Sequence, residues 1–263
     1  MLKSLYTTAT GMKAQQTMVD TIANNIANVN TAGFKRSQAT FEDLLYLTMQ
    51  APGLAQDASG TASPIGLQIG SGSRVSGSNK IYTAGVLEGS GRKLDIAVEG
   101  DGFYQVLLSD GTVGYTRDGQ FMINADGKLT TAAGYLLQPE VTLAQDVTEV
   151  NIDSEGRVTV RTQGSSSVQQ VAQVQLAKFI NPSGLLAAGG NIVLETDASG
   201  TPITGNPGAN GLGSLKQGFV ERSNVEIVNE LVSLIVAQRA YEVNSRAIQT
   251  SDQMLSVATS IVR

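Results

Sequence analysis

A hydrophobic repeat at the C-terminal end of the chain constrains the fold most strongly. Apolar residues recur there every seven positions, at Ile227, Leu234, Tyr241, Ile248, Leu255 and Val262. No Gly or Pro falls after Gly218, and Ser223 with Glu226 forms a capping box. Because seven residues fall just short of two helical turns, the stripe stays against a partner helix only through left-handed supercoiling. We therefore expect one long amphipathic helix over 222–263 that packs against another helix.

The N-terminal segment 1–33 carries a matching repeat. Its apolar residues also recur every seven positions, at Leu5, Met12, Val19 and Ile26. They predict a helix from Leu2 to Val29, which Gly11 interrupts. Burying the stripe of the C-terminal helix contributes about 9–18 kcal/mol, whereas ordering its backbone costs about 40–80 kcal/mol. We therefore expect the two helices to form a coiled-coil-like pair that needs neighbours on further faces.

Composition excludes several classes of function. The chain of 263 residues has no Cys and no His, so thiol chemistry, imidazole catalysis and Cys/His zinc sites are excluded. Its net charge is -5 and its basic residues are scattered singly, which argues against nucleic-acid binding. No apolar run approaches the roughly 20 residues of a membrane span, and the N-terminus lacks a signal-peptide core. We expect no direct membrane insertion and no cleaved signal.

The middle of the chain predicts an antiparallel β domain over 91–221. Asp-Gly pairs suit turns with positive φ, and they recur at steps of eight or nine residues, at Asp101-Gly102, Asp110-Gly111, Asp118-Gly119 and Asp126-Gly127. The expected strands are 103–108, 119–123, 128–131, 135–138, 147–152, 157–161, 170–180 and 191–195. The predicted fold class is therefore α+β, with long N- and C-terminal helices on either side of a mostly antiparallel β domain.

The connecting segment 34–90 is less regular. Residues 39–49 are compatible with either a strand or a short helix, and 67–86 is predicted as irregular strand broken by glycines. Small and turn-forming residues dominate 51–66. That composition is typical of an extended arm with little core of its own.

The turn residues also allow chemical interpretations. The aspartates at the turns are compatible with a calcium site or a glycosidase, but Asp is favoured beside Gly for local geometry, and no calcium-loop spacing ends in a suitable Glu. Paired carboxylates hydrolyse glycans without His, so that alternative stays open. The glycine cluster 208–213 lacks the Lys of a phosphate loop. We expect no enzyme activity, no cofactor and no metal.

Two longer motifs carry a family resemblance. Residues 23–35, Ala-Asn-Asn-Ile-Ala-Asn-Val-Asn-Thr-Ala-Gly-Phe-Lys, resemble the N-terminal signature of bacterial flagellar rod and hook proteins. Residues 217–225 and 238–245 resemble the C-terminal signature of that family. Chain length and the stretch 50–70 are most similar to the distal rod members. A proximal rod or hook-type subunit is the alternative within the family, and an adhesin-like binding module with coiled-coil ends is the alternative outside it.

The resemblance implies a structural subunit of the basal body that is exported by the flagellar type III apparatus. Such a subunit polymerises helically into a hollow, rigid rod that transmits motor torque to the hook. Its implied partners are further copies of the chain, proximal rod proteins, the hook protein and the surrounding ring proteins. The terminal helices would form an inner domain that lines the export channel, with the β domain outside.

The resemblance and the heptads together select candidate assembly residues. Asparagine amides at 24, 25, 28 and 244 are either ordinary solvent-facing polar groups or hydrogen-bonding groups that fix helix register. The expected interface comprises Leu5, Met12, Val19, Ile22, Asn24, Asn25, Ile26, Asn28, Ile227, Leu231, Leu234, Tyr241, Asn244, Ile248, Leu255 and Val262. The expected rod-stiffening arm contains Pro52, Gly53, Pro64 and Gly66.

Overall fold

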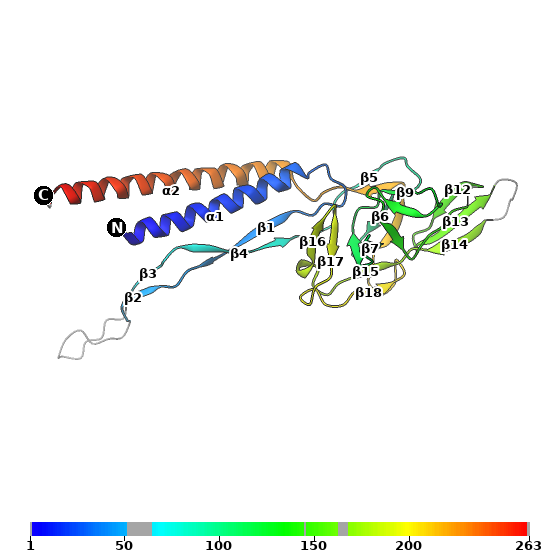
Figure 1. Cartoon of the computed structure of the whole chain (residues 1–263), viewed down its shortest axis with the longest axis horizontal. Coiled ribbons are helices and arrows are strands. Elements are labelled where there is room, and N and C mark those ends of the chain that lie inside the picture. Colours follow the sequence, from blue (N-terminus) through cyan, green and yellow to red (C-terminus); the bar gives the residue numbers. More distant parts are fainter. Residues whose placement is uncertain (1, 52–64, 145, 163–167, 262–263) are drawn as a thin grey trace. The chain divides into compact units, whose positions relative to one another are not determined.

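A computed structural model describes residues 2–51, 65–144, 146–162 and 168–261 (Figure 1). The chain forms two compact units. The helical unit comprises 1–26, 37–79 and 226–263, and the β-rich unit comprises 27–36 and 80–225. Two helices and many short antiparallel strands make up the described residues, which confirms the α+β class.

The helical unit contains two long helices that lie side by side and run antiparallel (Figure 1). Helix α1 spans Leu2–Ala27, close to the predicted end at Val29. Helix α2 spans Ile227–Ile261 and starts later than the predicted boundary at 222. The reason is that Ser223 Oγ accepts the N–H of Val225 at 3.2 Å instead of capping a helix, while the neighbouring Asn224 side chain binds extended backbone.

A narrow β ribbon belongs to the same unit. Strand β1 (Ser37–Asp43) pairs with β4 (Ser73–Lys80), and β2 (Leu47–Gln50) pairs with β3 (Leu67–Ile69). The ambiguous segment 39–49 therefore contributes to two strands and contains no helix. The ribbon contacts α1 where Lys3 Nζ donates to the carbonyl of Ile69 at 2.8 Å. It also approaches α1 at Gly72, where a Cβ atom would lie 2.2 Å from Thr10 Oγ1.

Short strands fill the β-rich unit. In chain order they are β5 Leu87–Gly89, β6 Ile96–Glu99, β7 Phe103–Leu107, β8 Val113–Thr116, β9 Phe121–Ile123, β10 Leu129–Thr131, β11 Leu136–Gln138, β12 Val147–Ile152, β13 Arg157–Thr162, β14 Gln169–Gln173, β15 Leu176–Lys178, β16 Leu186–Gly189, β17 Ile192–Leu194, β18 Ile203–Gly205, β19 Ser214–Gln217 and β20 Phe219–Glu221, with a 3-10 turn η1 at Pro182–Gly184. The main sheet has nine strands, in the order β16-β17-β8-β7-β11-β10-β9, and β15 and β18 join it through β7. Strands β12-β13-β14 form a separate sheet, and β6 and β5 pair with β19 and β20.

The expected strands correspond to β7, β9, β10, β11, β12, β13, β14, β15 and β17, but the Asp-Gly pattern misplaced one turn. Gly111 and Gly127 take positive φ, as turns between strands require. Gly119 serves a different purpose, because a Cβ atom there would lie 1.7 Å from the carbonyl oxygen of Ile96. Glycine is needed at 119 for close backbone approach, not for a hairpin turn. The prediction also omitted β5, β6, β8, β16, β18, β19 and β20, and it treated β14 and β15 as one strand although they join different sheets.

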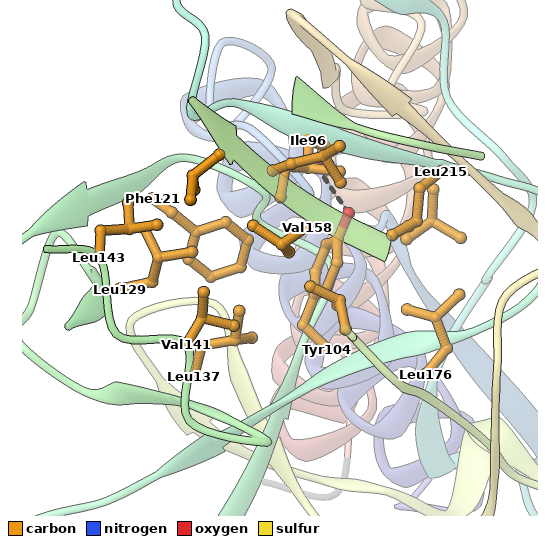
Figure 2. Packing of buried hydrophobic residues seen from close by; sticks show 14 of the residues in the cluster. Ile96, Tyr104, Phe121, Leu129, Leu137, Val141, Leu143, Val158, Leu176 and Leu215 are labelled. Atoms are coloured by element: carbon orange, nitrogen blue, oxygen red, sulfur yellow. Dashed lines mark hydrogen bonds between the residues drawn. The ribbon is translucent and has the colours of Figure 1, made fainter. Parts of the chain in front are cut away.

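The core of the β-rich unit is formed where these strands meet (Figure 2). Tyr104 is fully buried, and its hydroxyl donates to the carbonyl of Ile96 at 2.7 Å. Its ring packs edge-on against Phe121, with ring centroids 5.1 Å apart. Aliphatic side chains from β6, β10, β11, β13, β15 and β19 complete the cluster. The unit therefore has a hydrophobic core of its own, as an independently stable domain requires.

Candidate assembly surfaces

The two helices are in register through small and polar side chains. A Cβ atom on Gly11 would lie 3.1 Å from Asn244 Nδ2. Fourteen residues further along α1, Asn25 Nδ2 donates to Glu230 Oε2 at 3.3 Å. These two contacts are fourteen residues apart on each helix. Ala237 lies midway between Glu230 and Asn244 on α2, and it is buried. Glu230, Ala237 and Ser251 are buried and Asn244 is half-buried, so the covered side of α2 follows a line of small or polar side chains at 230, 237, 244 and 251.

The larger predicted stripe residues flank this line. Among the predicted interface residues, Ile22 and Asn25 are buried. The half-buried residues are Leu5, Met12, Val19, Ile26, Asn28, Leu234, Asn244, Ile248 and Leu255. The exposed residues are Asn24, Ile227, Leu231 and Tyr241, and Val262 lies outside the described residues. Val19 and Tyr241 line one groove of about 430 Å³ between the helices, whereas Asn28 belongs to the β-rich unit.

The N-terminal half of α2 has an exposed apolar face that the single heptad line did not predict. Val228 is 69% exposed, Val232 is 56% exposed and Ile235 is 51% exposed. The positions fourteen residues after these three are polar, namely Glu242, Arg246 and Gln249. The signal in the sequence was a second apolar line at 228, 232, 235 and 236. Inside a lone subunit this face has no cover among the described residues.

The β ribbon exposes a second apolar surface. Leu45 is 89% exposed, and Ile65 is 77% exposed. Further exposed side chains on the ribbon are Tyr46, Leu47, Met49, Leu67 and Ile69. Of the predicted arm residues, Gly66 is half-buried just before β3, while Pro52, Gly53 and Pro64 lie outside the described residues. Contiguous exposed apolar side chains typically mark interaction sites.

A buried ionic cluster in the β-rich unit joins the two signature motifs. Glu221 is 1% exposed, and its Oε1 lies 2.5 Å from Lys35 Nζ. Its Oε2 lies 3.0 Å from Arg117 Nε. The backbone adds two bonds, because Glu221 Oε1 accepts the N–H of Gly85 at 2.8 Å and the Glu221 carbonyl accepts the N–H of Gly33 at 2.8 Å. One carboxylate therefore holds three chain segments together.

The two cations of this cluster share the Glu221 carboxylate and also donate to backbone carbonyls. Burial lowers the pKa of Lys35 from its usual value, and the Glu221 carboxylate opposes that shift. Lys35 Nζ also donates to the carbonyl of Thr83 at 2.7 Å. Arg117 donates to the carbonyls of Gly102 and Gly100 at 2.6 and 2.8 Å. The sequence analysis did not predict this cluster. The available signal was that Lys35 lies inside the first signature motif and Glu221 inside the second.

Comparison with known proteins identifies the family. Residues 5–35 match the model of the flagella basal body rod protein, residues 97–160 match the flagellar hook protein FlgE/F/G D1 domain, and residues 216–261 match the flagellar basal body rod FlgEFG protein C-terminal model. The flagellar basal-body rod protein FlgG of Borreliella burgdorferi is 45% identical over 265 residues, which cover 100% of both chains. The chain belongs to the flagellar basal-body rod protein family. FlgG of Caulobacter vibrioides is 45% identical and FlgG of Bacillus subtilis is 39% identical, and each alignment again covers 100% of both chains.

Membership of the flagellar basal-body rod protein family assigns the chain to the flagellar basal body, as a structural protein. None of the helices in the described residues is long and apolar enough to cross a membrane. The same residues contain no cluster of three or more acidic side chains arranged to hold a metal ion.

Proposed function

We propose that the chain polymerises helically into the hollow, rigid distal rod of the flagellar basal body. The observation that carries this proposal is the exposed apolar face of α2 at Val228, Val232 and Ile235. A second copy of the chain that covers this face removes apolar area from water, which stabilises association by about 25 cal/mol per Å². Exposed apolar side chains on the β ribbon support the same proposal. The rod would transmit motor torque to the hook and enclose part of the export channel.

Within this proposal the segments have separate tasks. Residues 1–33 and 222–263 form the inner domain as a coiled-coil-like pair, and 91–221 forms the outer domain. Residues 34–90 connect them and include the arm 51–66. The predicted stripe residues contact one another within and between subunits. The partners we propose are further copies of the chain, proximal rod proteins, the hook protein, the ring proteins and the type III export apparatus. No catalytic step and no cofactor is part of this role.

Negative-stain electron microscopy of the purified chain over a range of concentrations tests the proposed polymerisation. We expect straight, hollow tubes above a threshold concentration, because association that buries the α2 face is bimolecular. Discrete particles at every concentration would contradict the proposal and favour an adhesin-like binding module.

The arm provides a separate prediction about rigidity. Deleting 51–66 should leave the helices and the β-rich unit intact but make the tubes more pliable, because an arm laid across neighbouring copies would add contacts that hinder sliding, and the deletion removes them together with the exposed Ile65. Curvature measured along the tubes in micrographs reports the effect. Tubes of the deletion variant that are as straight as those of the parent chain would contradict a stiffening role.

A further inference from the structure

Two asparagine side chains bind successive peptide groups of the chain. In the β-rich unit, Asn224 Oδ1 accepts the N–H of Arg36 at 2.8 Å. In the helical unit, Asn25 Oδ1 accepts the N–H of Ser37 at 2.8 Å, and Asn25 Nδ2 donates to the Ser37 carbonyl at 2.8 Å. Arg36 is the last residue of its segment in the β-rich unit, and Ser37 is the first residue of the next segment in the helical unit.

Asn224 also binds a third segment of the β-rich unit. Its Nδ2 donates to the carbonyl of Ile81 at 2.8 Å and to Thr83 Oγ1 at 2.9 Å. The N–H of Ile81 in turn donates to the carbonyl of Arg36 at 2.9 Å. The chain changes units at 36/37, at 79/80 and at 225/226, so these three residues lie within two positions of three changes. One side-chain amide therefore ties together three connecting segments.

Asn25 has the corresponding position in the helical unit. It is 1% exposed and lies two residues before the change of unit at 26/27. Besides Ser37 at the start of β1, it binds the buried carboxylate of Glu230 in the first turn of α2. The end of α1, the start of β1 and the start of α2 are therefore joined by one side chain.

We propose that Asn25 and Asn224 are positioning residues that clamp the connecting segments, each inside its own unit. A primary amide suits this task, because it accepts and donates hydrogen bonds at the same time. The chain changes units four times, so every covalent path for force runs through these connections. Segments that are held together by these hydrogen bonds carry the force jointly, whereas without the bonds each segment carries it separately. This inference rests on the proposed role of the chain in a rod that transmits torque.

Hydrogen exchange at single amides tests the clamps. In Asn224→Ala we expect the Arg36 amide to exchange about fivefold faster, the fold-change that one net hydrogen bond of about 1 kcal/mol predicts. Asn224→Asp keeps the acceptor and should restore protection of the Arg36 amide without restoring the bond to Ile81. The matched control Asn206→Ala changes an exposed asparagine of the same unit and should leave Arg36 unaffected.

The Asn25 clamp is tested in the assembled polymer. Asn25→Ala should accelerate exchange of the Ser37 amide by about the same fivefold factor, while Gln249→Ala on the exposed surface of α2 should not. Unchanged exchange at Arg36 in Asn224→Ala, or at Ser37 in Asn25→Ala, would overturn the corresponding clamp. Amide exchange reports local contacts. The Asn224 experiment is carried out on unassembled protein, so its result remains valid even when no tubes form.

Force sharing is tested by motility under load. Cells that carry Asn25→Ala together with Asn224→Ala should swim like the parent strain in dilute medium and lose speed relative to it in viscous medium. A general folding defect would lower speed in both media. Parent-like speed at high viscosity would overturn force sharing even with accelerated amide exchange, and that result would leave the proposed rod function intact.

Discussion

Replacing Glu221 by alanine should lower the free energy of unfolding of the β-rich unit by about 3–5 kcal/mol. The carboxylate lies 2.5 Å from Lys35 Nζ and 3.0 Å from Arg117 Nε, and all three side chains are buried. Its removal leaves two buried cations near each other without their shared anion. It also frees the N–H of Gly85, which loses its acceptor. The cost of uncompensated buried charge is therefore much larger than the cost of one lost surface ion pair.

Urea unfolding followed by near-ultraviolet circular dichroism measures this effect, because the buried rings of Tyr104 and Tyr115 belong to the β-rich unit. The matched control is Glu149→Ala, which removes an exposed carboxylate 3.3 Å from Arg161 Nη1. We expect Glu149→Ala to lower the free energy of unfolding by about 0–1 kcal/mol. Glu221→Gln keeps the side-chain shape and should show most of the loss. If both Glu221 variants lower the free energy of unfolding by no more than the control does, the ionic cluster does not stabilise the β-rich unit.

Local patterns made the helices and most strands predictable. Heptads at both ends predicted α1 to within two residues at Ala27, and turn spacing located β12 at Val147–Ile152. These patterns work because helix and strand periodicity depend on neighbours in sequence. The start of α2 was not predictable in this way, because Asn224 binds Arg36 and Ile81, far away in the chain, and holds its own backbone extended.

The sequence patterns also did not predict the long-range features of the candidate sites, because these depend on residues that are far apart in the chain. Lys35 and Glu221 are separated by 186 positions, and no local spacing relates them. The requirement for Gly119 depends on the carbonyl of Ile96, which a turn pattern does not contain. The heptad stripes located both helices, and their use as packing surfaces between subunits stays a prediction. They did not show that the buried line of α2 runs through the small residue Ala237 while Ile235 stays exposed.

Ile235→Asp should raise the concentration at which tubes form by about a hundredfold or more. Ile235 is 51% exposed, so a neighbouring copy that covers it would bury about half of a side chain worth about 1.5–3 kcal/mol. Burying an unpaired carboxylate at the same place costs at least a further ~2 kcal/mol. Together these losses exceed about 2.7 kcal/mol, which corresponds to a hundredfold change in affinity. Sedimentation across a concentration series measures the threshold.

The control for this prediction lies on the same helix line. Gln249 is fourteen residues after Ile235 and is also exposed, but it falls in the polar half of the outer face. Gln249→Asp introduces the same carboxylate at the equivalent heptad position, so the threshold should change by less than about threefold, the size of a surface charge effect. Equal thresholds for the two variants would show that α2 associates through charge or through other faces. A raised threshold for Ile235→Asp alone would place the apolar half of α2 inside the assembled polymer, because both substitutions introduce a carboxylate but only Ile235→Asp removes an apolar side chain from the proposed interface.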